Sequence, residues 1–149
     1  MSYDALRTGR YSSPGQVYLV TTVTHARQTL FLDFSLARCV VAELRHAHDT
    51  GGVISMAWVL MPDHLHWLIQ LGACDTLAAV MKSVKGRTAH AIKRLDPQRQ
   101  TIWQRGYHDH ALRTDEDVRG VAEYIANNPL RAGLVTQMGD YSHWDAAWV

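Results

Sequence analysis

The chain has 149 residues, of which 47% are apolar and 19% charged, with a formal net charge of +1. This apolar content is typical of a globular domain and excludes an intrinsically disordered chain. Two cysteines without framework spacing exclude a disulfide scaffold. No apolar run approaches the roughly 18 residues of a membrane span. We therefore expect a single domain over residues 1–149, with 136–149 as a short C-terminal tail, in a cytoplasmic protein.

Hydrophobic periodicity predicts seven elements in the order β-α-β-β-α-β-α. Strands are expected over 16–24, 53–60, 64–71 and 101–113. Helices are expected over 33–48, from a cap at Asp75 through a buried stripe ending at Leu95, and from a cap at Thr114 to Asn128, before Pro129. The first six elements match a ferredoxin-like (split βαβ) arrangement. We predict an α+β fold in which a four-stranded antiparallel sheet carries two helices on one face, and a C-terminal helix covers the other.

Positive charge is concentrated in one stretch of the chain. Residues 81–105 hold seven basic residues and one acidic residue, which gives a local net charge of +6. Such a segment is either a surface that follows phosphate groups or a solvated helix face, and charge alone does not separate the two.

Nine histidines are unusual for this length, and their spacing separates them. His64 and His66 lie two apart on a predicted strand, so both side chains share one face and two imidazoles can hold one cation. Polar residues on an exposed strand face are the simpler interpretation. His108 and His110 have the same spacing on a predicted strand and are a rival pair. His46 and His48 lie on a helix, where this spacing points side chains apart.

The final predicted helix supplies a partner for one histidine pair. Tyr124 and Asn128 are four residues apart and share a helix face. A tyrosine hydroxyl is a nucleophile for phosphodiesters when a hard cation such as Mg²⁺ polarises the phosphate, and an amide oxygen is a suitable further ligand. The alternative is a boundary tyrosine and a helix-terminal asparagine without chemical function.

Four segments together resemble a known family. PDHLHWLI (62–69) resembles the His-hydrophobe-His motif of single-tyrosine HUH endonucleases, and YIANNPLRAGLV (124–135) resembles their tyrosine-bearing helix. WQRGYHDHALR (103–113) and RYSSPGQVYLVTTVT (10–24) also fit. In this order they resemble the REP-associated tyrosine transposases, a bacterial branch of the HUH transposases, over roughly residues 7–149 of the chain.

The resemblance implies a reaction and its residues. His64, His66 and Asn128 would bind Mg²⁺ or Mn²⁺, and Tyr124 would attack single-stranded DNA to form a 5′-phosphotyrosine. Asn128 stands where the mobile insertion-sequence branch looks to have Gln, which is one methylene longer. The substrate would be a palindromic REP-type hairpin in the nucleoid. A monomer is slightly favoured over a homodimer, and the sequence leaves open whether Tyr124 acts in cis or in trans. DNA contacts are expected from Arg10, Lys82, Lys85, Lys93, His108, His110 and Arg131.

Two other functions remain open from the sequence. The chain could be a non-catalytic regulatory module that binds hairpin DNA or RNA through an RRM-like sheet. It could also be a metallohydrolase that uses water at the histidine pair, for which Asp63 is the nearby carboxylate. The tail aromatics over 140–149 could stack on bases, dock on the protein, or lie over the active site.

Overall fold

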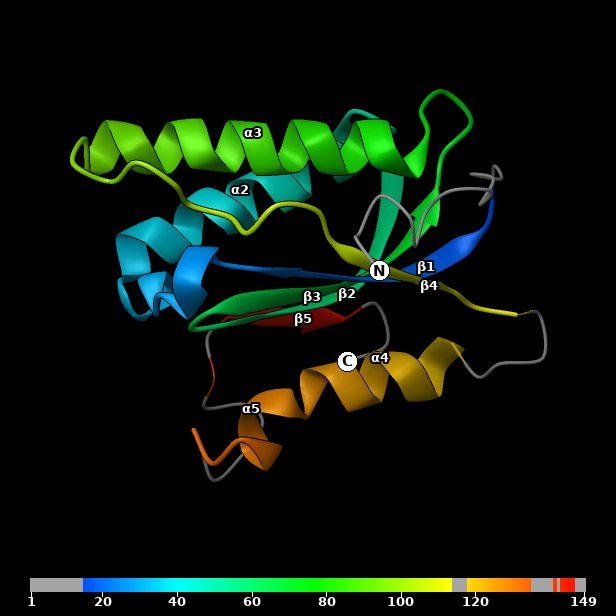
Figure 1. Ribbon diagram of the computed structural model, residues 1–149. Helices are drawn as coiled ribbons and strands as arrows, with labels where there is room; N and C mark the ends of the chain where they lie inside the picture. Colours follow the sequence, from blue (N-terminus) through cyan, green and yellow to red (C-terminus); the bar gives the residue numbers. More distant parts are fainter. Residues whose placement is uncertain (1–14, 114–117, 135–140, 142, 147–149) are drawn as a thin grey trace.

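A computed structural model describes residues 15–113, 118–134, 141 and 143–146 (Figure 1). Its centre is a five-stranded antiparallel sheet in the order β4-β1-β3-β2-β5. The strands are β1 (Val17–Val23), β2 (Val53–Met61), β3 (His64–Leu71), β4 (His108–Ala111) and β5 (Trp144–Ala146). Helices α2 (Phe34–Asp49) and α3 (Leu77–Leu95) cover one face, and α4 (Val118–Ala126), followed by the short α5 (Asn128–Arg131), lies on the other. The predicted α+β class and the placement of the last helix are confirmed.

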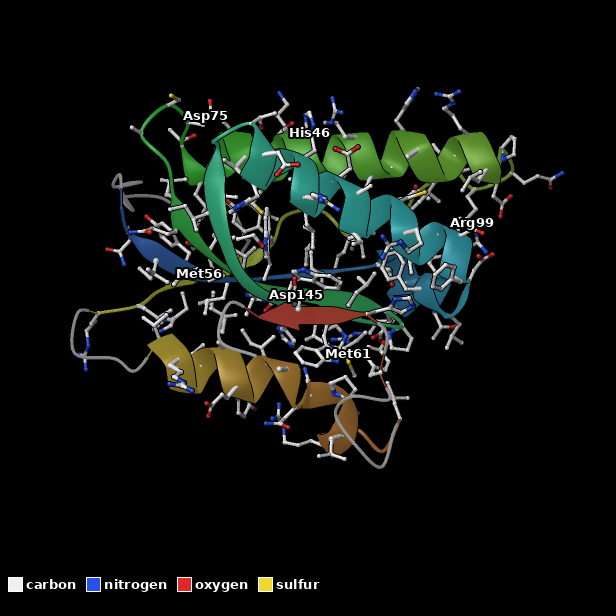
Figure 2. All side chains as sticks on the ribbon, turned by 180° about the vertical axis from the view of Figure 1, so that it is seen from behind. His46, Met56, Met61, Asp75, Arg99 and Asp145 are labelled. Carbon is white, nitrogen blue, oxygen red and sulfur yellow. The ribbon has the colours of Figure 1, made fainter. Side chains whose placement is uncertain are left out.

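The predicted count of four strands is wrong, because the tail adds a fifth. Strand β5 pairs antiparallel with β2, and Figure 2 shows it, with Asp145, as the outermost strand. The Tyr141 hydroxyl donates to the Leu60 carbonyl, while the Leu60 N–H donates to His143 at 2.8 Å. An uncovered β2 edge would leave backbone groups unpaired, and this part of the tail satisfies them. Of the three arrangements considered for the tail, the described residues 141 and 143–146 adopt the one in which the tail packs on the protein itself, against β2.

The predicted strand over 101–113 is reduced to its last third. Only β4 pairs with β1, and Trp103 makes an isolated bridge to Thr24. Before β4 the chain buries Ile102, Trp103 and Tyr107, and Gly106 adopts a positive φ of 80°. Trp103 donates from Nε1 to the buried Thr88 hydroxyl at 2.8 Å. Aromatic burial against α3 thus replaces strand pairing in this segment.

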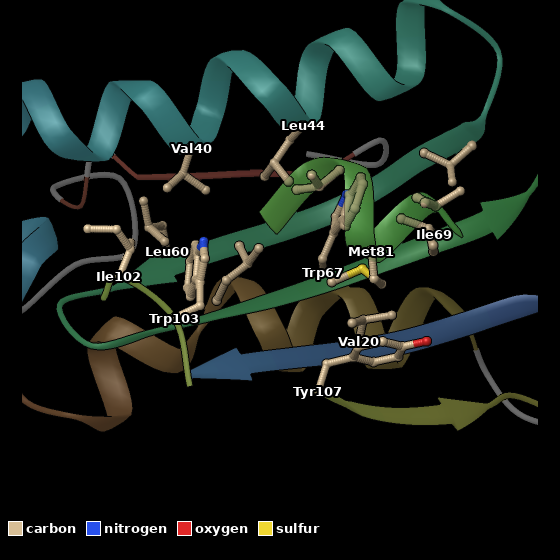
Figure 3. Close-up of a cluster of buried hydrophobic side chains, with 14 of the residues drawn as sticks. Val20, Val40, Leu44, Leu60, Trp67, Ile69, Met81, Ile102, Trp103 and Tyr107 are labelled. Carbon is tan, nitrogen blue, oxygen red and sulfur yellow. The ribbon is translucent and has the colours of Figure 1, made fainter. Parts of the chain in front are cut away.

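Two apolar layers fill the molecule, one on each side of the sheet. The larger lies between the sheet and helices α2 and α3, and Figure 3 shows Trp67, Leu44 and Met81 within it. Leu65, Trp67, Ile69 and Leu71 point into this layer from β3. Because side chains alternate along a strand, His64 and His66 point to the opposite face, where Leu68 packs toward α4.

Local hydrogen bonding decides where the helices begin and end. Asp33 caps α2, but Thr76, not Asp75, caps α3 by accepting from the Ala79 N–H at 3.1 Å. Leu95, predicted to be buried, is 58% exposed because α3 extends past the layer that it covers. The predicted Thr114 cap lies outside the described residues. No helix in the described part of the chain is long and apolar enough to cross a membrane.

The predicted helix ending near Asn128 is divided in two. Helix α4 ends at Ala126, and Pro129 lies in the first turn of α5. Proline has no N–H to donate and clashes with the preceding turn, so it is tolerated at a helix start but not within a helix. Tyr124 therefore belongs to α4 and Asn128 to α5.

Candidate functional site

The two histidines of β3 form a close pair. Their ring centroids are 4.8 Å apart and the rings are nearly perpendicular. Both side chains are partly buried on the sheet face that α4 covers. The strand spacing in the sequence predicted this shared face, and the structure places the pair on the same side of the sheet as the helix that carries Tyr124.

Each imidazole is held at Nδ1 by a different neighbour. The Asp63 carboxylate lies 2.7 Å from Nδ1 of His64, and the Thr21 hydroxyl lies 2.9 Å from Nδ1 of His66. When Nδ1–H donates to these oxygens, the lone pair of each ring resides on Nε2. Metal-binding histidines in proteins are oriented by this kind of hydrogen bond. In this tautomer both Nε2 atoms carry the lone pair with which an imidazole binds a metal ion.

Sequence reasoning did not identify Thr21. It stands directly opposite His66 in the β1–β3 register, so a correct strand alignment would have found it. The same row continues outward, since His108 on β4 is opposite Thr21 and therefore points to the same face. His108 lies two strands from His66, about 10 Å away at usual strand spacing. His108 is thus beside the site, and His110 lies one pair further along the same face.

Asp63 is shared between His64 and Arg27. Its second oxygen accepts from Arg27 Nη1 at 3.3 Å. Burial acts to raise the pKa of Asp63, but the hydrogen bonds and positive charge of His64 and Arg27 outweigh it and lower that pKa overall. The carboxylate is therefore ionised and engaged on both sides. This use explains why it is not a free base for water, as the metallohydrolase alternative would need.

Backbone strain accompanies the Arg27 contact. Ala26 and Arg27, in the turn His25–Arg27, both adopt φ of 53°. This left-handed conformation costs non-glycine residues about 1–2 kcal/mol each. The turn is held by the Thr24 hydroxyl, which donates its one proton to the Gln28 backbone carbonyl (2.8 Å) and lies 3.1 Å from the Asp63 backbone carbonyl. Strained residues of this kind often lie at functional sites.

His66 is held in its neutral form. Burial, the nearby His64 and the positive charge of Arg131 lower its pKa from 6.5 to about 4. A neutral imidazole is the form that binds metals. Among the described residues no group of three His, Cys, Asp or Glu side chains could hold a metal ion. Within that part of the chain, a further ligand beside the two imidazoles would be an amide or carbonyl oxygen, water or a bound phosphate.

Tyr124 extends from the exposed side of α4. Its side chain is 63% exposed, so its hydroxyl is accessible to a substrate. The Arg131 guanidinium lies over its ring, with Cζ 3.7 Å from the ring centroid. Asn128 is half-buried at the start of α5. Within the described residues no hydrogen bond links Asn128 to either histidine, so its role as a metal ligand stays a prediction.

The residues predicted to contact DNA separate into different positions. Lys82 and Lys93 are exposed and line a groove of 670 Å³ between α3 and residues 100–107. Lys85 differs, because its ammonium donates to the carbonyls of Gln104 (2.8 Å) and Gly106. Lys85 thus holds the loop beside the groove. Arg10 lies outside the described residues.

Comparison with known proteins identifies the class of protein to which this fold and site belong. A family model described as "Transposase IS200 like" matches residues 14–128, and the chain belongs to this transposase family. It is 32% identical over 134 residues to the REP-associated tyrosine transposase of Escherichia coli (strain K12), covering 89% of this chain and 77% of that relative. The resemblance drawn from the four motifs is confirmed, and the protein is an enzyme of the transposase family.

Solved structures support the fold. A REP-associated tyrosine transposase bound to a REP hairpin aligns with a TM-score of 0.76 at 24% identity, covering 91% of this chain and 79% of that one. At this identity the match speaks for the arrangement of strands and helices. The antiparallel sheet with helices on both faces is therefore shared with a structurally characterised transposase.

Proposed function

We propose that the protein is a metal-dependent endonuclease and strand transferase for single-stranded DNA, acting on palindromic REP-type hairpins through Tyr124. The observation that carries the proposal is the histidine pair with both Nδ1 atoms engaged and both Nε2 atoms left as donors, on the sheet face covered by the Tyr124 helix. The sheet that holds the pair is interpreted as a ferredoxin-like unit, β4-β1-β3-β2, extended by β5.

The proposed reaction is covalent catalysis. Tyr124 Oη attacks the phosphorus, an O–P bond forms and the P–O3′ bond breaks, which gives a 5′-phosphotyrosine and a 3′-hydroxyl. The phenolic proton passes to solvent, and the departing 3′ oxygen takes a proton from solvent. Attack by a second 3′-hydroxyl reverses these changes and joins two strands without ATP, because the intermediate keeps the energy of the original bond.

The residues present fit a divalent cation. His64 and His66 would hold it through Nε2, with Asn128 proposed as an amide ligand and the remaining positions left to phosphate oxygens and water. When bound, Mg²⁺ or Mn²⁺ would polarise the phosphate and orient it for in-line attack. Asp63 and Thr21 act earlier, by fixing the two rings before any cation arrives.

The groove beside α3 is the proposed surface for the hairpin stem. Lys82 and Lys93 are eleven residues apart on one helix, about 16 Å at 1.5 Å per residue, which suits contact with several phosphates. The relative of known structure was solved bound to a REP hairpin. We further propose a monomer with Tyr124 acting in cis, because in the described part of the chain the edge strand β5 offers three residues, Trp144–Ala146, for pairing with another sheet.

The test is an adduct assay on a denaturing gel. A single-stranded hairpin oligonucleotide with flanking sequence is incubated with Mg²⁺ or Mn²⁺, and a protein–DNA band that survives denaturation is measured. Tyr124→Phe should abolish this band and keep hairpin binding within about threefold of wild type. His64→Ala should lose the band, whereas His90→Ala, an exposed histidine on α3, should keep it.

The same assay separates the alternatives. Hairpin binding by the wild type without any adduct would support a non-catalytic binding module. Cleavage without an adduct would support hydrolysis by water. An adduct that persists in Tyr124→Phe would show that another residue is the nucleophile.

A further inference from the structure

A break in the helix places one arginine over the proposed nucleophile. Pro129 restarts the chain as α5, and α5 turns Arg131 back toward Tyr124, seven residues earlier. Arg131 Nη1 donates to the Tyr124 carbonyl at 2.7 Å, and its Cζ lies 3.7 Å from the centre of the Tyr124 ring. Two separate contacts therefore fix the guanidinium relative to this tyrosine.

Arg131 also acts on the histidine pair. Its positive charge is one of the causes that lower the pKa of His66, so the guanidinium lies within electrostatic range of the proposed metal ligands. The Arg131 guanidinium thus contacts the tyrosine on α4 and acts electrostatically on His66 of β3.

The guanidinium has unused capacity for a ligand. Its flat face is against the Tyr124 ring, while its N–H donors lie in its own plane at the edge. Within the described residues one of the five donors is used, by the Tyr124 carbonyl. Stacking and phosphate binding use different parts of the group and are compatible.

We propose that Arg131 binds the scissile phosphate of the DNA beside Tyr124, and that its stacking holds the Tyr124 ring in position for attack. This inference rests on the proposed function, since it names a catalytic residue of the same reaction. Lysine cannot replace both contacts, because an ammonium has no planar face and no paired donors.

The experiment measures single-turnover adduct formation by Arg131→Ala, Arg131→Lys and a matched control, Arg119→Ala. Arg119 is an exposed arginine of α4 paired with Glu123 at 3.4 Å. Arg131→Ala should slow the reaction by about 10²–10³-fold, as for loss of one donor to a transition-state oxyanion. Arg131→Lys should recover only part of the rate, and Arg119→Ala should react like wild type.

Four further measurements distinguish phosphate binding from a helix cap. Methylguanidinium added to Arg131→Ala should restore at least tenfold of the lost rate, because it can occupy the space of the guanidinium. Hairpin affinity, measured in the Tyr124→Phe background, should fall and its salt slope should decrease by about 1, as for one lost phosphate contact, whereas Mn²⁺ affinity should change less than about threefold. Thermal unfolding of each variant checks that the fold persists.

The outcomes are separable from those of the proposed function. An Arg131→Ala protein that reacts at the wild-type rate, or a slow one that methylguanidinium does not rescue, would overturn this inference and leave the Tyr124 reaction in place. A wild type that forms no adduct would overturn both.

Discussion

The Thr21 hydroxyl on β1 lies 2.9 Å from Nδ1 of His66 on β3, the residue directly opposite it in the sheet. A threonine without recognisable motif thus orients a proposed metal ligand. The hydroxyl and the neighbouring strand together fix which imidazole nitrogen faces outward. Several consequences of such contacts can be measured on the purified protein.

Removal of the Thr21 hydroxyl should weaken metal binding. Thr21→Val keeps the shape of the side chain but leaves Nδ1 of His66 without its partner, and loss of such a contact typically costs 10–100-fold in metal affinity. Mn²⁺ titration by calorimetry measures the effect. Thr21→Ser, which retains the hydroxyl, should bind within about threefold of wild type, and equal losses in both variants would contradict the assigned role.

Relief of backbone strain should stabilise the protein. Ala26 adopts φ of 53°, which glycine accepts without steric cost. Relief of about 1–2 kcal/mol of strain outweighs the greater entropy that glycine gives the unfolded chain, so Ala26→Gly should raise the free energy of unfolding by about 0.5–1 kcal/mol. Ala42→Gly, in the exposed interior of α2, should lower it by about 1 kcal/mol. Urea denaturation compares the two, and effects of the same sign would refute the strain.

Stability without metal should fall in acid through His66. Its pKa is about 4 in the folded protein, against 6.5 for the ordinary group. Between pH 6.5 and pH 4 the imidazole is protonated in the unfolded chain but neutral in the folded protein. The contribution of His66 to the free energy of unfolding is therefore fully present above pH 6.5 and is lost as pH falls toward 4. The loss at pH 5 should be on the order of 1–2 kcal/mol. Urea midpoints in EDTA at pH 7 and pH 5 should converge in His66→Gln, and an unchanged gap would exclude this source.

The three lysines of α3 should differ in effect. Lys82→Ala and Lys93→Ala should each weaken hairpin binding and reduce the slope of log affinity against log salt by about 1. Lys85→Ala should instead lower the melting temperature, because the carbonyls of Gln104 and Gly106 lose their donor. Binding at several salt concentrations and thermal melts provide the two measurements. A normal melting temperature for Lys85→Ala would contradict its structural role.

Local patterns in the sequence predicted most of the fold. The His64–Leu71 strand has the predicted bounds, and α2 differs by one residue at each end, because alternation and helical spacing follow directly from burial. The β5 strand was not predictable in this way. Three residues carry little periodicity, and their strand conformation depends on an open edge of β2 that is distant in sequence.

The residues of the candidate site likewise divide into those that local sequence patterns predict and those that depend on tertiary structure. His64, His66 and Tyr124 were found from spacing and motif. Thr21 and the Arg131 contact were not, because each depends on tertiary geometry: a strand register in one case and a helix break at Pro129 in the other. The proposed reactive residues can be recognised from the sequence, whereas the residues that orient them can be recognised only from the folded structure.

The β1–β3 register links folding accuracy to chemistry. Seven consecutive pairs run from Val17–Gln70 to Val23–His64, with Thr21 opposite His66 among them. Because side chains alternate, a slip of β3 by one residue would turn both histidines into the larger apolar layer and move Trp67, which is fully buried there, to the face that α4 covers. Burial of the apolar face of β3 therefore favours the one register in which His64 and His66 point toward the α4 side of the sheet. A chain that folds stably thus also has its two histidines correctly oriented.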